Sequence, residues 1–491
     1  MTDTDTGENC AITRREAPLA VHCAWLAHAM GIPKPKPPPT VSTRAPKRSR
    51  ESDDAVTPPK EGEFPLPLSI AAVADEPEPQ GEAWPARSLI FKCWKPTVVD
   101  NRDAMLVEAL LERGWIDGGG LCDPEDINTL PRCLAGKDAQ RPLPRRAVWI
   151  AGDSGEVKLM HAAFSSSDAR LASRFRVSGL PGTGPACFKT YTAAAMADEP
   201  FSPTTFVLPA QRAALLAAAS SLGGAKGVKA ARAAGAYWVG KPKCNYSGRG
   251  ITVADDVAAL ADGVGVVQRY VHRPLLIGES KFHMRVYMLV TALDPVRAYI
   301  HNDLCVMFST MPYTLSPKTL GKHFEPRVHL TNYGINAKTS NAERYLADKP
   351  GVGRGCLWDG KRLERWLLAQ RADITMEGVL RQLRIIGRAA AQAIADHPNV
   401  RRHLLKHPHA ETVGYELFGL DTMLDADGKA WLLECNDSPG LEYCAKPGME
   451  CPDAAEGDAT TRGVIHDMFA LLGFDRDVCD KGRQANFLRV A

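Results

Sequence analysis

Three side chains that suit a hard cation stand near the ends of two neighbouring apolar runs. Asp421 lies near the end of the first run, and Glu434 and Asn436 lie near the end of the second. The Asp-Ala-Asp-Gly turn at residues 425–428 between the runs is a strong β-hairpin signal. Because positions of matching parity on two antiparallel strands point to the same face, we expect the three side chains to converge. Two carboxylates and an amide oxygen suit Mg²⁺, which takes its other ligands from water and nucleotide phosphates. The alternative is an amphipathic hairpin whose polar face contacts only water.

Basic side chains upstream of this hairpin could bind phosphates. Lys241 precedes a proline, and the Gly-Arg-Gly loop at residues 248–250 can bring backbone N–H groups close to a phosphate. Lys281 and Arg285 are separated by an even interval, so a strand would place both on one face with His283 between them. Such a cationic stripe suits phosphates or a substrate carboxylate, and an exposed basic strand is the alternative.

Five segments, in order along the chain, resemble the tubulin–tyrosine ligase-like family, a branch of the ATP-grasp ligases. They are residues 238–243 with 247–251, residues 266–271, the KFHMRVY strand at 281–287, the HLTNY segment at 329–333, and the FGLD and WLLECNDSP stretches of the hairpin. One Gly-rich loop would be weak support, whereas five ordered segments are specific. The KFH form of the basic strand resembles a divergent branch of the family.

The resemblance implies a set of site residues. The implied metal ligands are Asp421, Glu434 and Asn436; the implied nucleotide contacts are Lys241, Gly248, Arg249, Gly250, Ile251, Gln268, Arg269, Tyr270, Val271, Lys281, His283, Thr331 and Asn332; and the implied catalytic residues are Arg285, Lys281 and Glu434. Gln268 would contact the adenine edge, with the backbone of residues 269–271 as the hinge. Lys189 matches a family nucleotide lysine only within a poorly matching neighbourhood.

The resemblance also implies a reaction. An ATP- and Mg²⁺-dependent ligase would join an amino acid, glutamate, tyrosine or glycine, to a protein carboxylate through an acyl phosphate. Its acceptor would be tubulin or another acidic protein tail. The alternatives are an inactive, nucleotide-binding family member that acts as a binding protein, and a ligase for a non-tubulin carboxylate.

Two positions depart from the family pattern. His283 replaces an aspartate, and Met307 stands where the family usually has an arginine. Loss of a phosphate-facing arginine can lower the rate by several powers of ten if nothing replaces it. Lys322 or His323, which are close in sequence, are candidate replacements. The three metal-ligand positions are all present, which favours a working site.

Composition limits the class of protein. The chain has 491 residues, 45% of them hydrophobic, with 60 Lys plus Arg against 57 Asp plus Glu. This balance does not favour a nucleic-acid partner. The 13 cysteines lack a C-x-x-C pair and are typical of reduced thiols in an intracellular protein. No apolar run reaches membrane-spanning length. We therefore expect an intracellular protein, a monomer in the cytoplasm, and the resemblance implies microtubule, cilium or flagellum as candidate locations.

The expected fold class is α/β (α+β), an ATP-grasp fold with a small N-terminal α/β domain. The expected divisions are a disordered Pro-rich and charged extension at 1–85, the small domain at 86–165, a central ATP-grasp subdomain at 166–270, a C-terminal ATP-grasp subdomain at 271–480, and a tail at 481–491. Strands are expected at 89–94, 147–150, 237–239, 265–270, 281–291, 297–301 and 304–308, with a tight turn at Asn302-Asp303 between the last two. Helices are expected at 104–113, 210–221, 255–261, 363–368 and 460–472, and a longer one capped by Thr375 and stopped by Pro398. A mobile polar loop is expected at 336–356.

Overall fold

The structure is a computed structural model that describes residues 89–93, 104–117, 146–150, 157, 161, 175–223, 228–243, 248–260, 264–336, 357–406, 414–441, 454–474 and 486–491. The expected disorder of residues 1–85 and nearly all of the expected loop at 336–356 lie outside these described residues.

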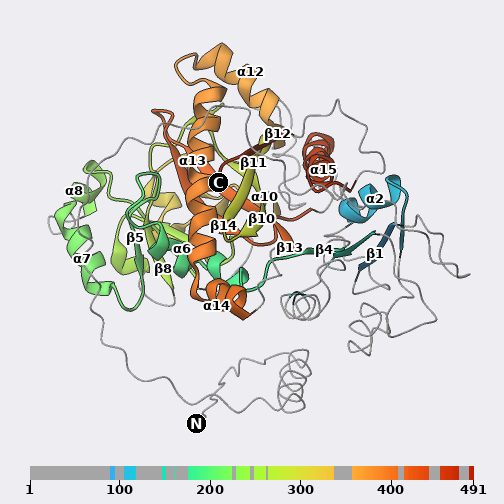
Figure 1. Ribbon diagram of the computed structural model, residues 1–491. Coiled ribbons are helices and arrows are strands. Elements are labelled where there is room, and N and C mark those ends of the chain that lie inside the picture. The colour runs from blue at the N-terminus through green and yellow to red at the C-terminus, as the bar shows by residue number, and fades with distance from the viewer. Residues whose placement is uncertain are drawn as a thin grey trace, which may run out of the picture. The chain divides into compact units, whose positions relative to one another are not determined.

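The larger of the two sheets among the described residues is mixed and has 11 strands (Figure 1). Its main path runs β12-β11-β10-β13-β4-β3-β1-β2, and β14, β15 and β9 pair with β13, β11 and β10 respectively. The strands are β1 (Leu89–Cys93), β2 (Trp115–Asp117), β3 (Arg146–Ile150), β4 (Phe175–Ser178), β9 (Leu276–Ile277), β10 (Ser280–Leu293), β11 (Val296–Phe308), β12 (Leu357–Asp359), β13 (Gly414–Leu424), β14 (Ala430–Asn436) and β15 (Phe487–Arg489). Strand β13 is parallel to β4 and antiparallel to β10 and β14, so it joins a parallel half to an antiparallel half.

A second, four-stranded antiparallel sheet has the order β5-β8-β6-β7. Its strands are β5 (Thr205–Val207), β6 (Trp238–Lys241), β7 (Thr252–Ala254) and β8 (Val266–Arg269), and the helices next to it in the chain are α7 (Arg212–Ser221) and α8 (Val228–Ala233). Leu215 of α7 packs with Trp238 and Val267 in the apolar core of this sheet. The core fixes β6 and β8, whose ends carry Lys241 and Gln268.

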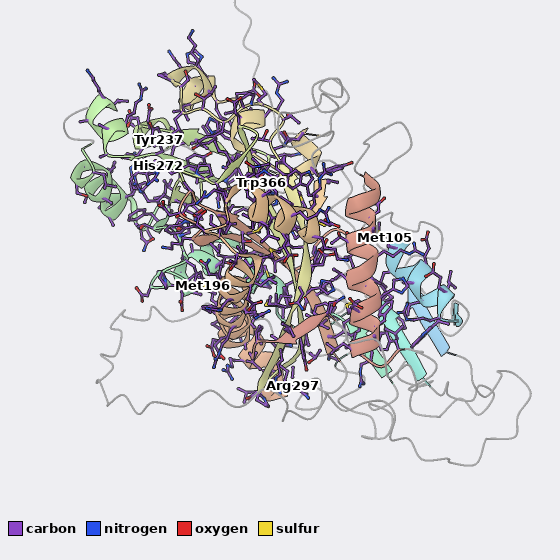
Figure 2. The ribbon with its side chains drawn as sticks, turned by 90° about the horizontal axis from the view of Figure 1, so that it is seen from above. Met105, Met196, Tyr237, His272, Arg297 and Trp366 are labelled. Atoms are coloured by element: carbon purple, nitrogen blue, oxygen red, sulfur yellow. The ribbon has the colours of Figure 1, made fainter. Side chains whose placement is uncertain are left out.

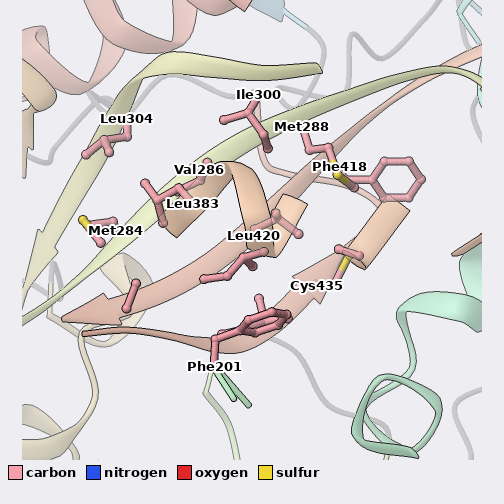
Figure 3. Close-up of a cluster of buried hydrophobic side chains, with 14 of the residues drawn as sticks. Phe201, Met284, Val286, Met288, Ile300, Leu304, Leu383, Phe418, Leu420 and Cys435 are labelled. Atoms are coloured by element: carbon pink, nitrogen blue, oxygen red, sulfur yellow. The ribbon is translucent and has the colours of Figure 1, made fainter. Parts of the chain in front are cut away.

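Strand β10 supplies apolar side chains to both faces of the large sheet. Met284, Val286 and Met288 enter a core covered by α13 (Met376–Asp396), part of which Figure 3 shows. Tyr287 and Leu289 enter a second core, shared with α2 (Ala104–Glu112) and α15 (Ala454–Leu471). The other α-helices of the described ranges are α6 (Lys189–Ala195), α9 (Pro326–His329), α10 (Tyr333–Asn336), α12 (Gly360–Gln370) and α14 (Pro398–Lys406). Burial on both faces explains why β10 is apolar from Val286 to its end, apart from Thr291.

Helix α13 begins as the sequence predicts. Thr375 is its N-cap, and the backbone N–H of Gly378 donates to Thr375 Oγ1 at 3.1 Å. Val379 and Leu383 lie on its buried face. The helix ends at Asp396, and Pro398 begins α14 immediately afterwards. The cap and the apolar stripe are therefore both confirmed.

The turn predicted at Asn302-Asp303 is wrong, because β11 continues through it as one strand. The register passes from Val286 opposite Leu304 to Met288 opposite Ile300, so three residues of β11 face one of β10. Asp303 Oδ1 accepts hydrogen bonds from the N–H groups of Leu304 and Gly360, each at 2.9 Å. These turn-forming residues therefore make a β-bulge rather than a chain reversal.

The mixed α/β class is confirmed, as are the hairpin and the strands and helices expected at 89–94, 104–113, 147–150, 237–239 and 265–270. The expected helix at 255–261 is a 3₁₀ turn, Val257–Leu260, and the closing helix begins earlier than expected, at Ala454. Within the described part of the chain, no helix has both the length and the apolar character that a membrane crossing requires.

Candidate functional site

A pocket of about 860 Å³, partly open to solvent, lies between the small sheet and the first residues of β10. Its walls come from β6, β8, β10, β13 and β14, from the loop after β6, and from the segment that follows α9. The lining residues that the sequence predicted are Lys189, Lys241, Gly248, Arg249, Ile251, Gln268, Arg269, Tyr270, Val271, Lys281, His283, Thr331, Asn332, Asp421 and Glu434. The fold thus gathers residues that span more than 240 positions of the sequence.

Three predicted residues do not line the pocket. Arg285 and Asn436 lie just beside it and both bind Asp421, while Gly250 continues the turn after Arg249. Lys322 and His323 are exposed and are also not among the lining residues, so their placement does not support the idea that they replace the missing arginine.

A β-bulge, and not regular alternation, brings Asp421 and Glu434 together. Thr422 pairs with Leu432, but Asp421 pairs with Glu434, so Leu433 is an extra residue on β14. In a regular register of the same sequence, Leu433 would face Asp421 and Glu434 would point to the opposite face. Regular alternation along the two strands therefore does not suffice to place both carboxylates on one face, and the bulge supplies the missing shift. The bulge also frees the Leu433 carbonyl, which accepts a hydrogen bond from Lys241 Nζ at 3.1 Å.

Asp421 is the best-connected carboxylate of the pocket. Arg285 Nε donates to Asp421 Oδ1 at 2.6 Å, and a second guanidinium nitrogen donates to Oδ2 at 3.2 Å. Asn436 Nδ2 approaches Oδ2 at 3.4 Å. Burial, the largest single effect, acts to raise the pKa of Asp421, but the charges of Arg285 and His283 and the hydrogen bonds from Arg285 and Asn436 together outweigh it, and the pKa is lowered. Asp421 is therefore held ionised.

Lys241 and Lys189 bring positive charge to the other side of the pocket. Lys241 Nζ donates to Gln268 Oε1 at 2.9 Å, and Gln268 Nε2 donates to Thr205 Oγ1 at the same distance. Burial lowers the pKa of Lys241 to about 8, although the Glu434 charge acts against this. Lys189 Nζ lies 3.4 Å from Glu434 Oε2. Thus Lys189, the weakest sequence match, does reach the pocket.

Lys281 is held in place by contacts that the sequence did not indicate. Its Nζ donates to Tyr270 OH and to the His329 carbonyl, both at 2.8 Å, and lies 4.4 Å from the centre of the Tyr270 ring. Tyr270 OH and His329 Nδ1 are 3.1 Å apart. Burial, together with the nearby Lys241 charge, lowers the pKa of Lys281 to about 7. His329 opens the HLTNY segment, so the motif contained the signal, but the bond from Lys281 to its carbonyl depends on tertiary structure.

The hinge after β8 is supported by aromatic packing. Tyr237 and His272 lie next to each other (Figure 2), with ring centroids 5.8 Å apart and 30° between the planes. Tyr313 OH donates to the His272 carbonyl at 2.9 Å. The Arg269 guanidinium stacks on Trp238 at 5.1 Å. These contacts fix the backbone of residues 269–271, which the sequence assigned to the hinge.

The donor set fits a hard cation in chemistry. Asp421 and Glu434 are register partners, and Asn436 follows two residues later on the same face. Mg²⁺ is commonly held by one or two carboxylates plus phosphate oxygens, so this set suffices if a nucleotide supplies the rest. Among the described residues, no group of three or more His, Cys, Asp and Glu side chains is placed to hold a metal ion. A cation here would therefore depend on a co-bound anion.

The pocket is also built for an anion with an apolar part. Five cationic residues line it against two carboxylates, namely Lys189, Lys241, Arg249, Arg269 and Lys281 against Asp421 and Glu434. Val239, Ile251, Leu330 and Met423 supply apolar walls. A flat aromatic group attached to a polyanion matches both features.

Sequence comparison agrees with this geometry. Residues 184–451, more than half of the chain, match the family model described as Tubulin-tyrosine ligase family. The chain belongs to this family. The family predicted from the five segments is therefore confirmed, and the matched region contains every residue predicted for the site.

Several members of the tubulin-tyrosine ligase family are similar to this chain. Tubulin monoglutamylase TTLL4 of Homo sapiens is 32% identical over 276 residues, which cover 56% of this chain and 20% of that protein. Probable tubulin polyglutamylase TTLL2 of Mus musculus is 28% identical over 418 residues, which cover 83% of this chain and 66% of that protein. Tubulin polyglutamylase ttll-4 of Caenorhabditis elegans is 30% identical over 240 residues, which cover 49% and 36%. The chain thus spans between about a fifth and about two thirds of these relatives.

The two departures from the tubulin-tyrosine ligase family pattern are direct neighbours. His283 on β10 pairs with Met307 on β11. His283 Nδ1 lies 2.6 Å from Thr331 Oγ1, and its Nε2 lies 3.8 Å from Asp421 Oδ1. Burial lowers the pKa of His283 to about 4, so the ring is neutral. A neutral His283 ring whose Nε2–H points toward the Asp421 carboxylate accepts a hydrogen bond at Nδ1 from the Thr331 hydroxyl. His283 thereby orients Thr331, which is a predicted nucleotide contact.

Proposed function

We propose that this protein is an ATP- and Mg²⁺-dependent ligase that joins an amino acid to a protein carboxylate. The observation that carries the proposal is one pocket in which the predicted cationic, apolar and carboxylate groups meet. Glutamate is the first amino acid to test, because the similar relatives are named glutamylases, and tubulin is the first acceptor to test for the same reason. Tyrosine and glycine are the amino acids to compare with glutamate.

Each group has a role in this proposal. Lys241 and Lys281 neutralise phosphate charge, and the apolar walls with Gln268 take the adenine. Asp421, Glu434 and Asn436 hold Mg²⁺, which supplies charge neutralisation on the phosphates when bound. Arg285 orients Asp421 through its two hydrogen bonds.

In the proposed reaction, a carboxylate oxygen attacks the γ-phosphorus of ATP, the bond to the β–γ bridging oxygen breaks, and ADP leaves as the acyl phosphate forms. An amine then attacks the acyl carbon, the C–N bond forms as the amine gives up a proton, and inorganic phosphate leaves. Both steps build negative charge on oxygen in the transition state. Fixed cations therefore stabilise the transition state more than they stabilise the ground state. The lysines are already held by hydrogen bonds, so little reorganisation is required.

The test combines nucleotide binding with a mass assay. Purified protein, Mg-ATP and tubulin are incubated separately with glutamate, tyrosine and glycine. We expect a mass increase on tubulin with one amino acid, and its loss in Glu434→Gln. Glu364→Gln, an exposed site on α12, is the matched control and should keep full activity.

Two other outcomes have clear meanings. Mg-ATP binding without transfer to tubulin would favour either an inactive binding protein or a ligase for another carboxylate. The presence of His283 and Met307 is the observation that specifically favours the inactive binding protein. Failure to bind Mg-ATP under any condition would refute the proposed use of this pocket.

A further inference from the structure

Two cysteine thiols are in contact beside the candidate cation ligands. Cys187 ends the 3₁₀ turn Gly184–Cys187, and Cys435 lies on β14 directly after Glu434. Their Sγ atoms are 3.6 Å apart and share a weak hydrogen bond. A disulfide has an S–S length of about 2.05 Å, so a closure of about 1.5 Å would join them.

The two segments are held together at more than one point. A Cβ added to Gly184 would lie 3.1 Å from Asp437 Oδ2, so the start of the 3₁₀ turn also packs against the chain just after β14. Cys435 is buried in the core cluster, where Figure 3 shows it, and Cys187 packs against that cluster from a half-buried position. The segments that carry the two cysteines therefore approach each other at a second point besides the sulfurs.

A second, smaller cavity gives access to both sulfurs. It has about 410 Å³ of empty space, part of which is open solvent, and is lined by Cys187 and Cys435 together with Lys189, Lys241 and Glu434. Three of these lining residues also line the main pocket. A small oxidant in this cavity would meet the thiols next to the groups proposed to hold Mg²⁺ and phosphate.

We propose that Cys187 and Cys435 form an oxidation site for hydrogen peroxide, and that the resulting disulfide weakens the nucleotide–cation pocket. The Cys187 thiolate attacks peroxide, its S–O bond forms as the O–O bond breaks, and water leaves. The Cys435 sulfur then attacks the sulfenic sulfur, the S–S bond forms, the S–O bond breaks, and a second water leaves. Two thiols and one peroxide give one disulfide and two waters. The effect on the pocket depends on the proposed function.

The environment makes this oxidation slow. The hydrogen bond with Cys435, burial and the charges of Asp437 and Glu416 all raise the pKa of Cys187 well above its usual value. The thiolate fraction is therefore small, so the site responds to sustained oxidant and not to a brief pulse.

Closure of the disulfide would disturb Glu434. The two sulfurs must approach each other, and Glu434 is the immediate neighbour of Cys435 on the bulged strand, so any shift of Cys435 moves Glu434 as well. Mg²⁺ demands near-ideal octahedral geometry, and disturbing the groups that support a metal ligand typically costs about 10- to 100-fold in metal affinity. We expect the affinity for Mg-ATP to fall by about tenfold on oxidation.

The experiment measures the cross-link and the affinity separately on the full chain. Reduced protein is exposed to hydrogen peroxide for a long period, digested without reductant and analysed by mass spectrometry, while Mg-ATP affinity is measured on the same sample. We expect a peptide pair linked through Cys187 and Cys435, a lower affinity, and recovery of both with dithiothreitol. Cys187→Ser and, independently, Cys435→Ser should bind Mg-ATP when reduced and should not respond to peroxide. Cys305→Ser removes a buried thiol elsewhere and should respond like the unmodified chain.

The outcomes separate this inference from the proposed function. Absence of the linked peptide pair, or an equal loss of affinity in Cys187→Ser, would overturn the oxidation site. A linked pair with unchanged affinity would overturn its effect on the pocket. If the reduced protein does not bind Mg-ATP, the proposed function and the effect of the disulfide on it both fail, whereas the linked peptide still decides whether the thiols form an oxidation site.

Discussion

The affinity for ATP should fall as pH rises, because burial makes Lys281 easy to deprotonate. Its pKa in the free protein is lowered to about 7, and the added negative charge of a bound nucleotide would raise it. The affinity for ATP is then highest below pH 7 and decreases as the pH rises through 7. It stops decreasing once the pH exceeds the pKa of Lys281 in the complex. From pH 6 to pH 8 the ionised fraction of Lys281 falls from about 0.9 to about 0.1, which corresponds to about a tenfold loss of affinity. Lys241, with a pKa of about 8, adds about a twofold loss over the same interval.

Equilibrium binding of a fluorescent ATP analogue at pH 6 and pH 8, at constant ionic strength and with Mg²⁺ present, measures this change. The unmodified protein should lose about twentyfold in affinity, and Lys281→Arg, which stays ionised, should lose only about twofold. The titration of the nucleotide itself is common to both proteins, so the comparison isolates Lys281. Lys318→Arg, at an exposed lysine, should behave like the unmodified chain. If Lys281→Arg and the unmodified protein show the same pH dependence, Lys281 does not contact the nucleotide as a titrating cation.

Three further changes test other parts of the structure. Deletion of Leu433 makes the pairing regular and leaves Glu434 opposite Asp421, but it removes the carbonyl that accepts a hydrogen bond from Lys241, so nucleotide binding should drop. Leu433→Ala keeps that carbonyl and should retain binding; equal losses, with folding checked by circular dichroism, would contradict the role of the bulge. His283→Asp and Met307→Arg should each weaken ATP binding alone. The double variant should recover binding, with a coupling free energy of about 0.5–3 kcal/mol, whereas additive effects would show that the two residues act independently. Thr375→Ala should lower the free energy of unfolding by about 1 kcal/mol in urea titrations, and an unchanged midpoint would mean that the N-cap is dispensable.

The sequence predicted the elements of the site better than their relative orientation. Local signals were sufficient for the hairpin turn and for the Thr375 cap, because both depend on a few adjacent residues. The Leu433 bulge has no such signal, since an apolar residue in an apolar strand fits either register. Asn302 and Asp303 have turn chemistry, yet the long β10 partner keeps them in one strand, so tertiary pairing outweighed local preference.

The same limit applies to the pocket. The motif positions gave nearly all of its lining residues, but they did not show that Tyr270 and His329 hold Lys281, because those contacts join residues 11 and 48 positions away. The contact between Cys187 and Cys435 joins residues 248 positions apart, and composition alone indicated only reduced thiols.

Strand β13 has a consequence for how the chain folds as it is synthesised. It pairs in parallel with one edge of β4, where Gly414 lies opposite Val177 and Tyr415 lies opposite Ser178. At about 5–20 residues per second, a ribosome needs on the order of tens of seconds to reach β13 after completing β4. During this interval one edge of β4 lacks its native partner and is a template for wrong pairing. We expect the nascent chain to depend on chaperones until β13, the strand that also carries Asp421, has been made.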